Sequence, residues 1–143
     1  MSCCPKKETI ICEESPAAIG PYSVAVSAGD FVFISGQLGI DKETGNLVSG
    51  GIQEQTRKAL ENMKKILKSA GLGLEDVVKT TVFLQDMGDF AQMNAVYAEY
   101  FTRDFPARSA IQVGALPKSG LVEIEAIALN STDQQDQKDC CHE

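Results

Sequence analysis

Residues 52–70 read IQEQTRKALENMKKILKSA, and this stretch decides how the rest of the chain can be arranged. Its apolar and small side chains recur at alternating intervals of four and three residues, which places them on one stripe of a helix of about five turns. Glu54 and Lys58 form a favourable pair on the opposite side, and Gly71 is a stop signal. We therefore expect a long amphipathic helix with one side to bury. The stripe comprises Ile52, Thr56, Ala59, Leu60, Met63, Ile66, Leu67 and Ala70.

Strand-like segments precede this helix. Residues 22–27 (YSVAVS) and 31–35 (FVFIS) are rich in β-branched and aromatic side chains, and the intervening residues 28–30 (AGD) predict the turn of a hairpin. Residues 41–46 (DKETGN) are a second turn signal. An extra strand at residues 9–12 is possible in addition to this hairpin.

Further strands and a second helix follow the first helix. The strands are expected at residues 77–84, 108–113 and 121–129. The second helix is marked by an apolar stripe of Phe90, Met93, Tyr97 and Phe101. Asp86 or Asp89 is the candidate cap at its start.

This order of elements predicts an α+β fold in which one sheet has both helices on one face. We expect a single domain over residues 8–130, between an N-terminal tail at 1–7 and a disordered, polar, Cys-containing tail at 131–143. The last strand is apolar on both sides, with Val122 and Ile124 on one and Ile127 and Leu129 on the other. An apolar face without helices predicts that another subunit covers it.

Composition and charge exclude several classes of protein. No apolar run approaches the roughly 20 residues of a membrane-spanning helix, and the first residues lack the apolar core of a secretory signal. We therefore expect a cytoplasmic protein without membrane association. The net charge is −7, of which residues 8–130 carry −6. An acidic domain repels phosphate backbones, which disfavours nucleic acid as a partner.

The cysteines and the single histidine restrict the chemistry. Four of the five cysteines form adjacent pairs near the ends, a spacing that structural zinc sites do not favour, so reduced thiols are expected. The only histidine is His142, so the domain has no imidazole for a Ser-His-Asp triad, a Cys-His pair or a His-ligated metal. Catalysis would then depend on carboxylates, Arg, hydroxyls, amides and the backbone. The cysteines are Cys3, Cys4, Cys12, Cys140 and Cys141.

Two charged residues lie in apolar surroundings. Arg108 opens a strand directly after FPA at 105–107, and Glu123 lies inside the last strand with Glu125 on the same side. Isolated buried charges are costly, so they are normally paired or functional. Arg108 could form a structural ion pair with either glutamate. Alternatively, its guanidinium could bind a substrate carboxylate while a nearby Glu handles a water molecule, and the spacing leaves both readings open.

Ordered motifs resemble the Rid/YjgF family. Residues 106–125, PARSAIQVGALPKSGLVEIE, resemble its signature segment. Upstream, AIGPYS at 18–23, ISGQ at 34–37, VKTTV at 78–82 and DF at 89–90 match in the same order. The likeness runs from about residue 17 to residue 129 and covers nearly the whole domain. A series of ordered matches is specific, whereas PAR alone would not be.

The resemblance implies a fold, an assembly and an activity. The fold is a chorismate-mutase-like α+β domain with a mixed sheet, and the assembly is a homotrimer in which the sheets form a barrel with sites between subunits. The activity is hydrolysis of 2-aminoacrylate, 2-iminopropanoate and related 2-enamine or 2-imine acids, released by pyridoxal-phosphate enzymes, to 2-oxo acids and ammonia. Because an iminium carbon is already electrophilic, this chemistry requires neither a metal nor a bound cofactor.

The resemblance also assigns roles to residues. Arg108 matches the carboxylate-binding Arg, and Glu123 matches the Glu that activates the attacking water. Tyr22, Ser35 and Asn94 match pocket-lining positions, although packing, a strand end and a structural hydrogen bond are their respective alternatives. Many bacterial members have Cys where this chain has Ala110, so only the backbone of Ala110 could contact substrate.

Two other functions compete with imine hydrolysis. The first is an endoribonuclease, an activity that the resemblance implies for some members, and a lysine cluster on the first helix (Lys58, Lys64, Lys65 and Lys68) favours it. The acidic domain and the lack of a His acid–base pair argue against endoribonuclease activity. The second is a non-catalytic ligand-binding or chaperone-like module, which would keep Arg108 and tolerate the loss of Glu123.

Overall fold

The amphipathic stretch forms helix α1, Gly51–Ser69, in a computed structural model that describes residues 6–130. All members of the predicted stripe from Ile52 to Leu67 are buried. The helix ends as predicted, because Gly71 takes a positive φ of 74° and its amide donates to the Lys68 carbonyl. The Glu54–Lys58 pairing was wrong: Glu54 lies 3.8 Å from Arg57, and Lys58 lies 3.9 Å from Asp41.

Six strands form a single mixed sheet in the order β1-β2-β3-β6-β4-β5. Only β4 and β5 pair in parallel, because helix α2 (Phe90–Tyr100) connects them as a crossover, and the other neighbours are antiparallel. The strands are β1 Lys7–Ile10, β2 Ala25–Ala28, β3 Phe31–Leu38, β4 Val77–Leu84, β5 Ala107–Gln112 and β6 Val122–Leu129. Short 3-10 turns lie at η1 Leu74–Asp76, η2 Met87–Asp89 and η3 Pro117–Ser119.

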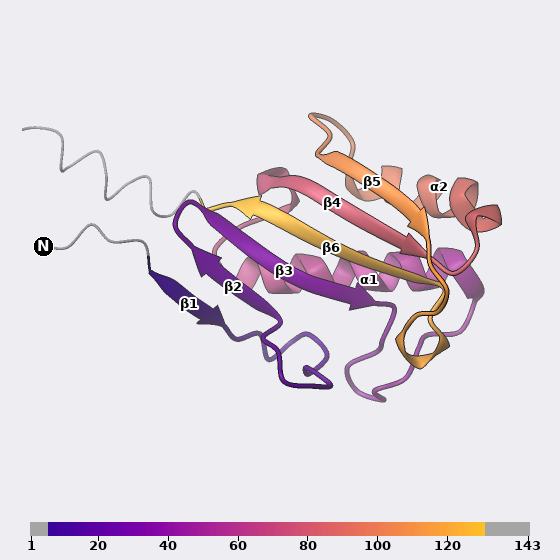
Figure 1. Cartoon of the computed structure of the whole chain (residues 1–143), viewed down its shortest axis with the longest axis horizontal. Coiled ribbons are helices and arrows are strands. Elements are labelled where there is room, and N and C mark those ends of the chain that lie inside the picture. Colours follow the sequence, from indigo (N-terminus) through magenta and orange to yellow (C-terminus); the bar gives the residue numbers. More distant parts are fainter. Residues whose placement is uncertain (1–5, 131–143) are drawn as a thin grey trace, which may run out of the picture.

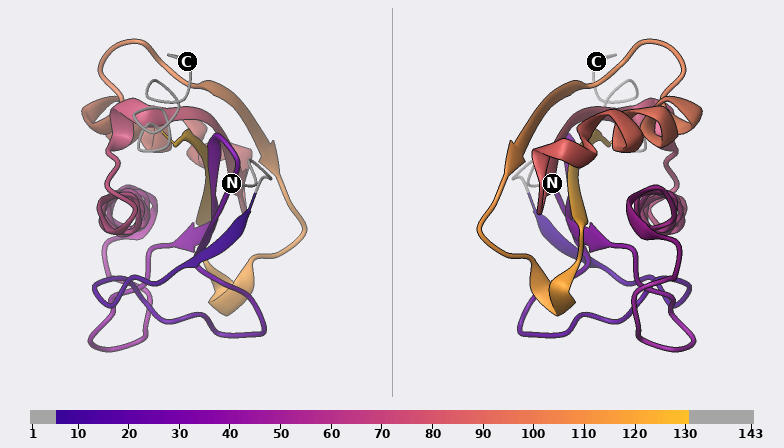
Figure 2. Two further views of the ribbon diagram at one scale, coloured as in Figure 1. Left: turned by 90° about the vertical axis from the view of Figure 1, so that its left-hand side faces the viewer. Right: turned by 90° about the vertical axis from the view of Figure 1, so that its right-hand side faces the viewer.

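Both helices lie on the same side of the sheet, as the edge-on views in Figure 2 show, so the predicted α+β arrangement is confirmed. The core between the two layers contains Leu60, Met63, Met93, Val122 and Ile124, each fully buried. Two polar side chains of α1 form hydrogen bonds with backbone groups near the ends of β3 and β6. Asn62 donates to the carbonyls of Leu38 and Ile40, and Gln55 accepts from the Leu121 amide.

The predicted bounds of five strands need correction. β2 begins at Ala25 instead of residue 22, and it includes Ala28, so the turn is formed by Gly29 and Asp30. β3 continues to Leu38, past the predicted end at Ser35, because a bulge between Ile34 and Gln37 shifts its register against β6 without ending the pairing. β5 and β6 each differ by one residue from prediction. β1 covers residues 7–10 instead of 9–12.

The capping prediction is correct in part. The Asp86 carboxylate accepts from the Gly88 amide and so caps η2, whereas Asp89 makes no side-chain cap at the start of α2. The tail at 131–143, and with it Cys140, Cys141 and His142, lies outside the described residues, as do Cys3 and Cys4. Cys12 is described, and it is a free, buried thiol.

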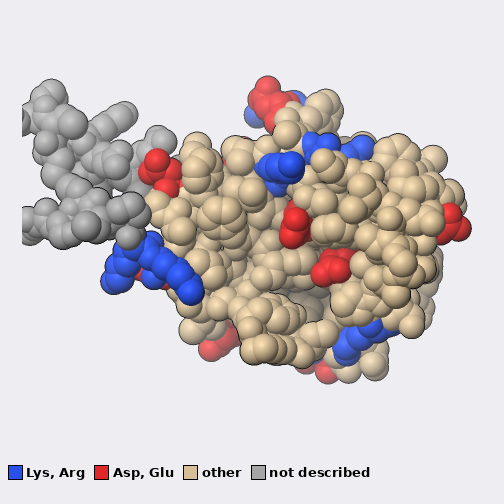
Figure 3. Space-filling model, viewed as in Figure 1, with Lys and Arg blue, Asp and Glu red and all other residues tan. Residues whose placement is uncertain are grey.

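The second face of the sheet, which Figure 1 views from the front, carries no helix. Phe33 in β3 is 45% exposed there, and Phe31 is also exposed, while Ile127 and Leu129 of β6 are half-buried. Figure 3 shows that this face is largely uncharged, with only a few acidic and basic groups near its middle. We call this surface, defined by Phe31, Phe33, Ile127 and Leu129, the open face.

Candidate functional site

Arg108 lies on the outermost strand of the sheet, next to α2. It pairs with Thr80 of β4, and its side chain extends over α2, where Nη1 donates to Asn94 Oδ1 at 2.8 Å. The guanidinium carbon lies 4.7 Å from the centre of the Tyr97 ring and 5.5 Å from that of Phe90, within the range of cation–π attraction. Among residues 6–130, Arg108 forms no ion pair, so neither Glu123 nor Glu125 neutralises it.

A cavity of about 350 Å³ opens beside the guanidinium. Asn94 and Arg108 supply its polar lining, and apolar side chains supply the rest. A mostly apolar hollow with one free cation at its border suits a small organic acid. The other lining residues are Tyr97, Ala98, Phe101, Phe105 and Pro106.

Glu123 lies elsewhere, half-buried on β6 between two residues that point into the core. Burial, and then the negative charge of Glu125, raise the pKa of the Glu123 carboxyl above its usual value. The bulge in β3 passes directly beneath this carboxylate. A Cβ placed on Gly36 would come within 2.1 Å of Glu123 Oε1, so only glycine leaves room for the side chain there.

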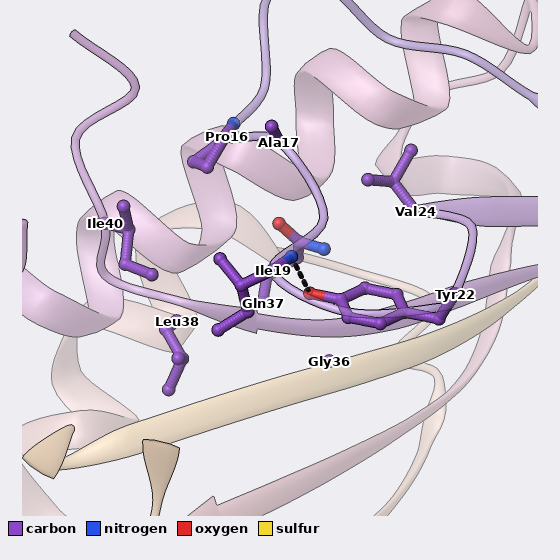
Figure 4. A pocket seen from close by; sticks show the side chains of 9 residues that line it. All are labelled: Pro16, Ala17, Ile19, Tyr22, Val24, Gly36, Gln37, Leu38 and Ile40. Atoms are coloured by element: carbon purple, nitrogen blue, oxygen red, sulfur yellow. Dashed lines mark hydrogen bonds between the residues drawn. The ribbon is translucent and has the colours of Figure 1, made fainter. Parts of the chain in front are cut away.

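Tyr22 lies near this bulge. Figure 4 shows its ring over the part of β3 that contains Gly36 and Gln37, with the hydroxyl accepting a hydrogen bond from the Ile19 amide at 3.2 Å. The small hollow that these residues line measures only about 30 Å³. The exposed phenol can still donate a hydrogen bond to a ligand, because the Ile19 contact uses only a lone pair.

The remaining predicted site residues have definite partners. Ser35 does not end a strand: its hydroxyl donates to the Ser23 carbonyl at 2.6 Å and joins the start of the hairpin to the bulge. Asn94 makes a structural hydrogen bond, which was the alternative to a pocket-lining role, and its partner is Arg108 itself. Ala110 lies on β5 two residues after Arg108, half-buried against the core.

The predicted residues therefore form two separate groups within one chain. Arg108, Asn94 and the cavity lie on the side of the sheet that α2 covers. Glu123 points to the other side, because its neighbours Val122 and Ile124 are fully buried beneath the helices and side chains alternate along a strand. A single chain does not bring Arg108 and Glu123 to one ligand.

Comparison with known proteins gives the family. The model of the family described as Endoribonuclease L-PSP matches residues 12–130. The chain belongs to the Rid/YjgF/L-PSP family. Among Rid proteins it is 50% identical to the human 2-iminobutanoate/2-iminopropanoate deaminase over 86% of this chain and 90% of that protein. The bovine protein of the same name is 53% identical over the same shares.

Solved structures of Rid relatives have the same fold. The crystal structure of RidA from Psychrobacter sp. PAMC 21119 superposes with a TM-score of 0.82 at 48% identity, covering 85% of this chain and 98% of that one. Escherichia coli TdcF with bound serine gives a TM-score of 0.81 at 43% identity with the same coverage. The YjgF-like fold expected from the sequence motifs is therefore confirmed.

Sequence reasoning missed three residues that shape the two groups of this Rid protein. Tyr97 appeared only as a member of an apolar stripe, Thr80 only as a strand residue, and Gly36 only as part of a motif. The spacing of Tyr97 and Asn94 on one helix, three residues apart, was the one signal that could have placed them on the same side. Within residues 6–130, no group of His, Cys, Asp and Glu side chains is arranged to hold a metal, and neither helix could span a bilayer.

Proposed function

We propose that this chain is a 2-iminobutanoate/2-iminopropanoate deaminase, which hydrolyses 2-enamine and 2-imine acids to 2-oxo acids and ammonia. The observation that carries this proposal is the Arg108 guanidinium, which no acidic side chain of residues 6–130 neutralises, at the border of a cavity of about 350 Å³. Relatives at 50% identity or more bear this activity in their names.

Arg108 would bind the carboxylate that all these substrates share. Asn94 occupies Nη1, and the remaining N–H groups of the guanidinium can form a two-pronged contact with a carboxylate. This contact orients the imine carbon without using any group that must react. The apolar lining of the cavity would receive the short side chain of the substrate.

Glu123 would act as the general base. Its carboxylate takes a proton from water as the water oxygen bonds to the iminium carbon and the C=N π pair moves to nitrogen, and it gives that proton to the resulting amine. It then accepts the proton of the new hydroxyl as C=O forms, the C–N bond breaks and nitrogen leaves as ammonia. Burial raises the pKa of Glu123 and so makes it a stronger base than an exposed carboxylate. Tyr22 and Ser35, on the same hairpin as Gly36, and the backbone of Ala110 would line the site.

The site would form between subunits. Because Arg108 and Glu123 lie on opposite sides of one sheet, an Arg108 from one chain must meet a Glu123 from another. The largely uncharged open face supports an assembly through the sheets, and we propose a homotrimer with three such sites. Its substrates would be the small imino acids that pyridoxal-phosphate enzymes release.

The experiment is imine decay in a coupled assay in which a threonine dehydratase supplies 2-iminobutanoate to the purified chain. Arg108→Ala should abolish the acceleration while the thermal unfolding midpoint stays unchanged, and Glu123→Gln should slow turnover while retaining carboxylate binding. Arg103→Ala, an exposed arginine in the preceding loop, is the matched control and should behave as wild type. Full turnover by Arg108→Ala would refute the proposal.

Mixed assemblies test the position of the site between subunits. Arg108→Ala chains, inactive alone, and Glu123→Gln chains, slow alone, should recover about a quarter of wild-type turnover when co-assembled in equal amounts. The reason is that Arg108 of one chain and Glu123 of its neighbour are both intact in about a quarter of the proposed sites. No recovery in verified mixed assemblies would mean that both residues act within one chain.

Ribonuclease activity is the second candidate, and the description of the family supports it. The lysine cluster on α1 gives it little support, because Lys58 lies 3.9 Å from Asp41 and Lys64 lies 3.9 Å from Glu61. RNA binding that weakens steeply with added salt, and cleavage that survives Arg108→Ala, would favour this candidate.

A further inference from the structure

The Arg108 side chain has more contacts within its own chain than carboxylate binding alone would require. A long arginine on an exposed edge strand would ordinarily sample many rotamers, and immobilising it on a ligand would weaken binding. Here the guanidinium already has three neighbours: Asn94 at one nitrogen, and the rings of Phe90 and Tyr97 beside its plane. Tyr97 is the nearer ring, with its centre 4.7 Å from the guanidinium carbon.

Tyr97 is itself held by contacts within the core. Its side chain is buried, its ring lies 4.6 Å from that of Phe101, and its hydroxyl lies 2.8 Å from the hydroxyl of Thr80, which is fully buried. Burial raises the pKa of the Tyr97 phenol, so the ring stays neutral and attracts the cation through its face.

Thr80 connects Tyr97 to the strand next to Arg108. It pairs with Arg108 across β4 and β5, so the strand that carries the guanidinium and the strand that holds Tyr97 are direct neighbours. The two hydroxyls satisfy each other in the core, where an apolar pair of similar shape would pack without any polar group to desolvate. Packing alone therefore does not require this pair of hydroxyls. A hydrogen bond at the end of the phenol does restrict the orientation of the Tyr97 ring.

We propose that Tyr97 is a positioning residue for the Arg108 guanidinium and that the buried Thr80 hydroxyl holds the Tyr97 ring in place. This inference rests on the proposed function, in which Arg108 binds the substrate carboxylate. The ring and Asn94 would hold the guanidinium so that its remaining N–H groups face the cavity before a ligand arrives. A preorganised guanidinium binds an anion with less loss of entropy.

The test measures 2-oxobutanoate binding by titration calorimetry and KM and kcat in the coupled imine assay, on the full chain. Tyr97→Leu should weaken 2-oxobutanoate binding and raise KM by roughly 2- to 30-fold, with a smaller change in kcat. Tyr97→Phe and Thr80→Val keep the shapes and remove only the hydroxyl contact, so each should raise KM by roughly 2- to 5-fold. The double variant should be no worse than either single variant, because both remove the same contact.

Tyr100→Phe is the matched control, since Tyr100 lies on the same helix and its hydroxyl donates to Glu61, away from Arg108. It should leave KM unchanged. Unchanged KM and binding in a folded Tyr97→Leu variant would overturn the inference. If that variant does not fold, unchanged KM in both Tyr97→Phe and Thr80→Val would overturn it.

Arg108→Ala separates this inference from the function on which it rests. Loss of 2-oxobutanoate binding in Arg108→Ala, together with wild-type binding in Tyr97→Leu, would leave the proposed function intact and refute only the positioning role. Retained binding in Arg108→Ala would refute both, because the guanidinium would then not bind the carboxylate.

Discussion

The substitution Gly36→Ala tests whether the place of the Glu123 carboxylate matters for catalysis. The backbone at Gly36 has a φ that alanine tolerates, so the added methyl group strains nothing by itself. It would, however, stand 2.1 Å from Glu123 Oε1 and 2.7 Å from Cδ, where ordinary contacts begin at 3.4 Å. The carboxylate must therefore withdraw by more than about 1 Å, and it can do so because the side chain is only half-buried.

A displacement of this size should impair the general base more than the fold. Misplacing a reacting group by about 1 Å can cost on the order of 10²-fold in rate. We expect kcat for 2-iminobutanoate to fall by roughly that factor, with KM changed little, because in the proposed site the carboxylate is bound by Arg108 of a neighbouring chain, which the substitution does not alter. The thermal unfolding midpoint should stay within a few degrees of wild type. Replacing glycine by alanine changes the free energy of unfolding by only about 0.4–1 kcal/mol, through the conformational entropy of the unfolded chain.

The measurement is imine decay at saturating substrate, with Gly114→Ala as the matched control. A Cβ on Gly114 would meet no atom within 4 Å, so this variant carries the same chemical change without the clash. If Gly36→Ala turns over within about 2-fold of wild type, the position of the Glu123 carboxylate above the bulge has no part in catalysis. An equal loss in Gly114→Ala would mean that the effect of the Gly36 substitution is not specific.

Other consequences of the structure can be measured independently. Because the negative charge of Glu125 raises the pKa of Glu123, and a base must be deprotonated, Glu125→Gln should move the acid limb of the kcat–pH profile to lower pH; an unmoved limb would mean another group titrates. Phe33→Asp on the open face should dissociate the proposed homotrimer in sedimentation velocity, and a retained trimer would place the interface elsewhere. Met63→Ala should lower the free energy of unfolding by about 2–5 kcal/mol in urea titration.

The sequence predicted the first helix better than most strand ends. α1 was predicted within one residue at each end, because seven buried positions repeat with helical period and Gly71 supplies the stop. The polar run at residues 35–37 looked like the end of a strand, but hydrogen bonds across the bulge keep it in the sheet. Pairing with neighbouring strands satisfies the backbone N–H and C=O groups of these residues, and the pattern of side chains does not predict that pairing.

The site was predictable only in part, for a geometric reason. Arg108 and Glu123 stood out because charges in apolar strands are costly. Val122 and Ile124 already implied the face on which Glu123 lies, but no pattern revealed which way the side chain of an edge-strand arginine turns. The contact between Thr80 and Tyr97 joins a strand to a helix 17 residues away, so sequence spacing could not predict it.

The fold explains why one chain carries two half-sites. The crossover through α2 places Asn94 and Tyr97 next to β5, so everything that holds the Arg108 guanidinium comes from residues 80–108. The carboxylate of Glu123 instead lies against Gly36 in the β3 bulge, on the other face of the sheet. Neither group can approach the other within one chain, because the sheet lies between them. Under the proposed function, a substrate that needs both the Arg108 guanidinium and the Glu123 base would be bound only where two chains meet, and assembly would then be a condition of catalysis.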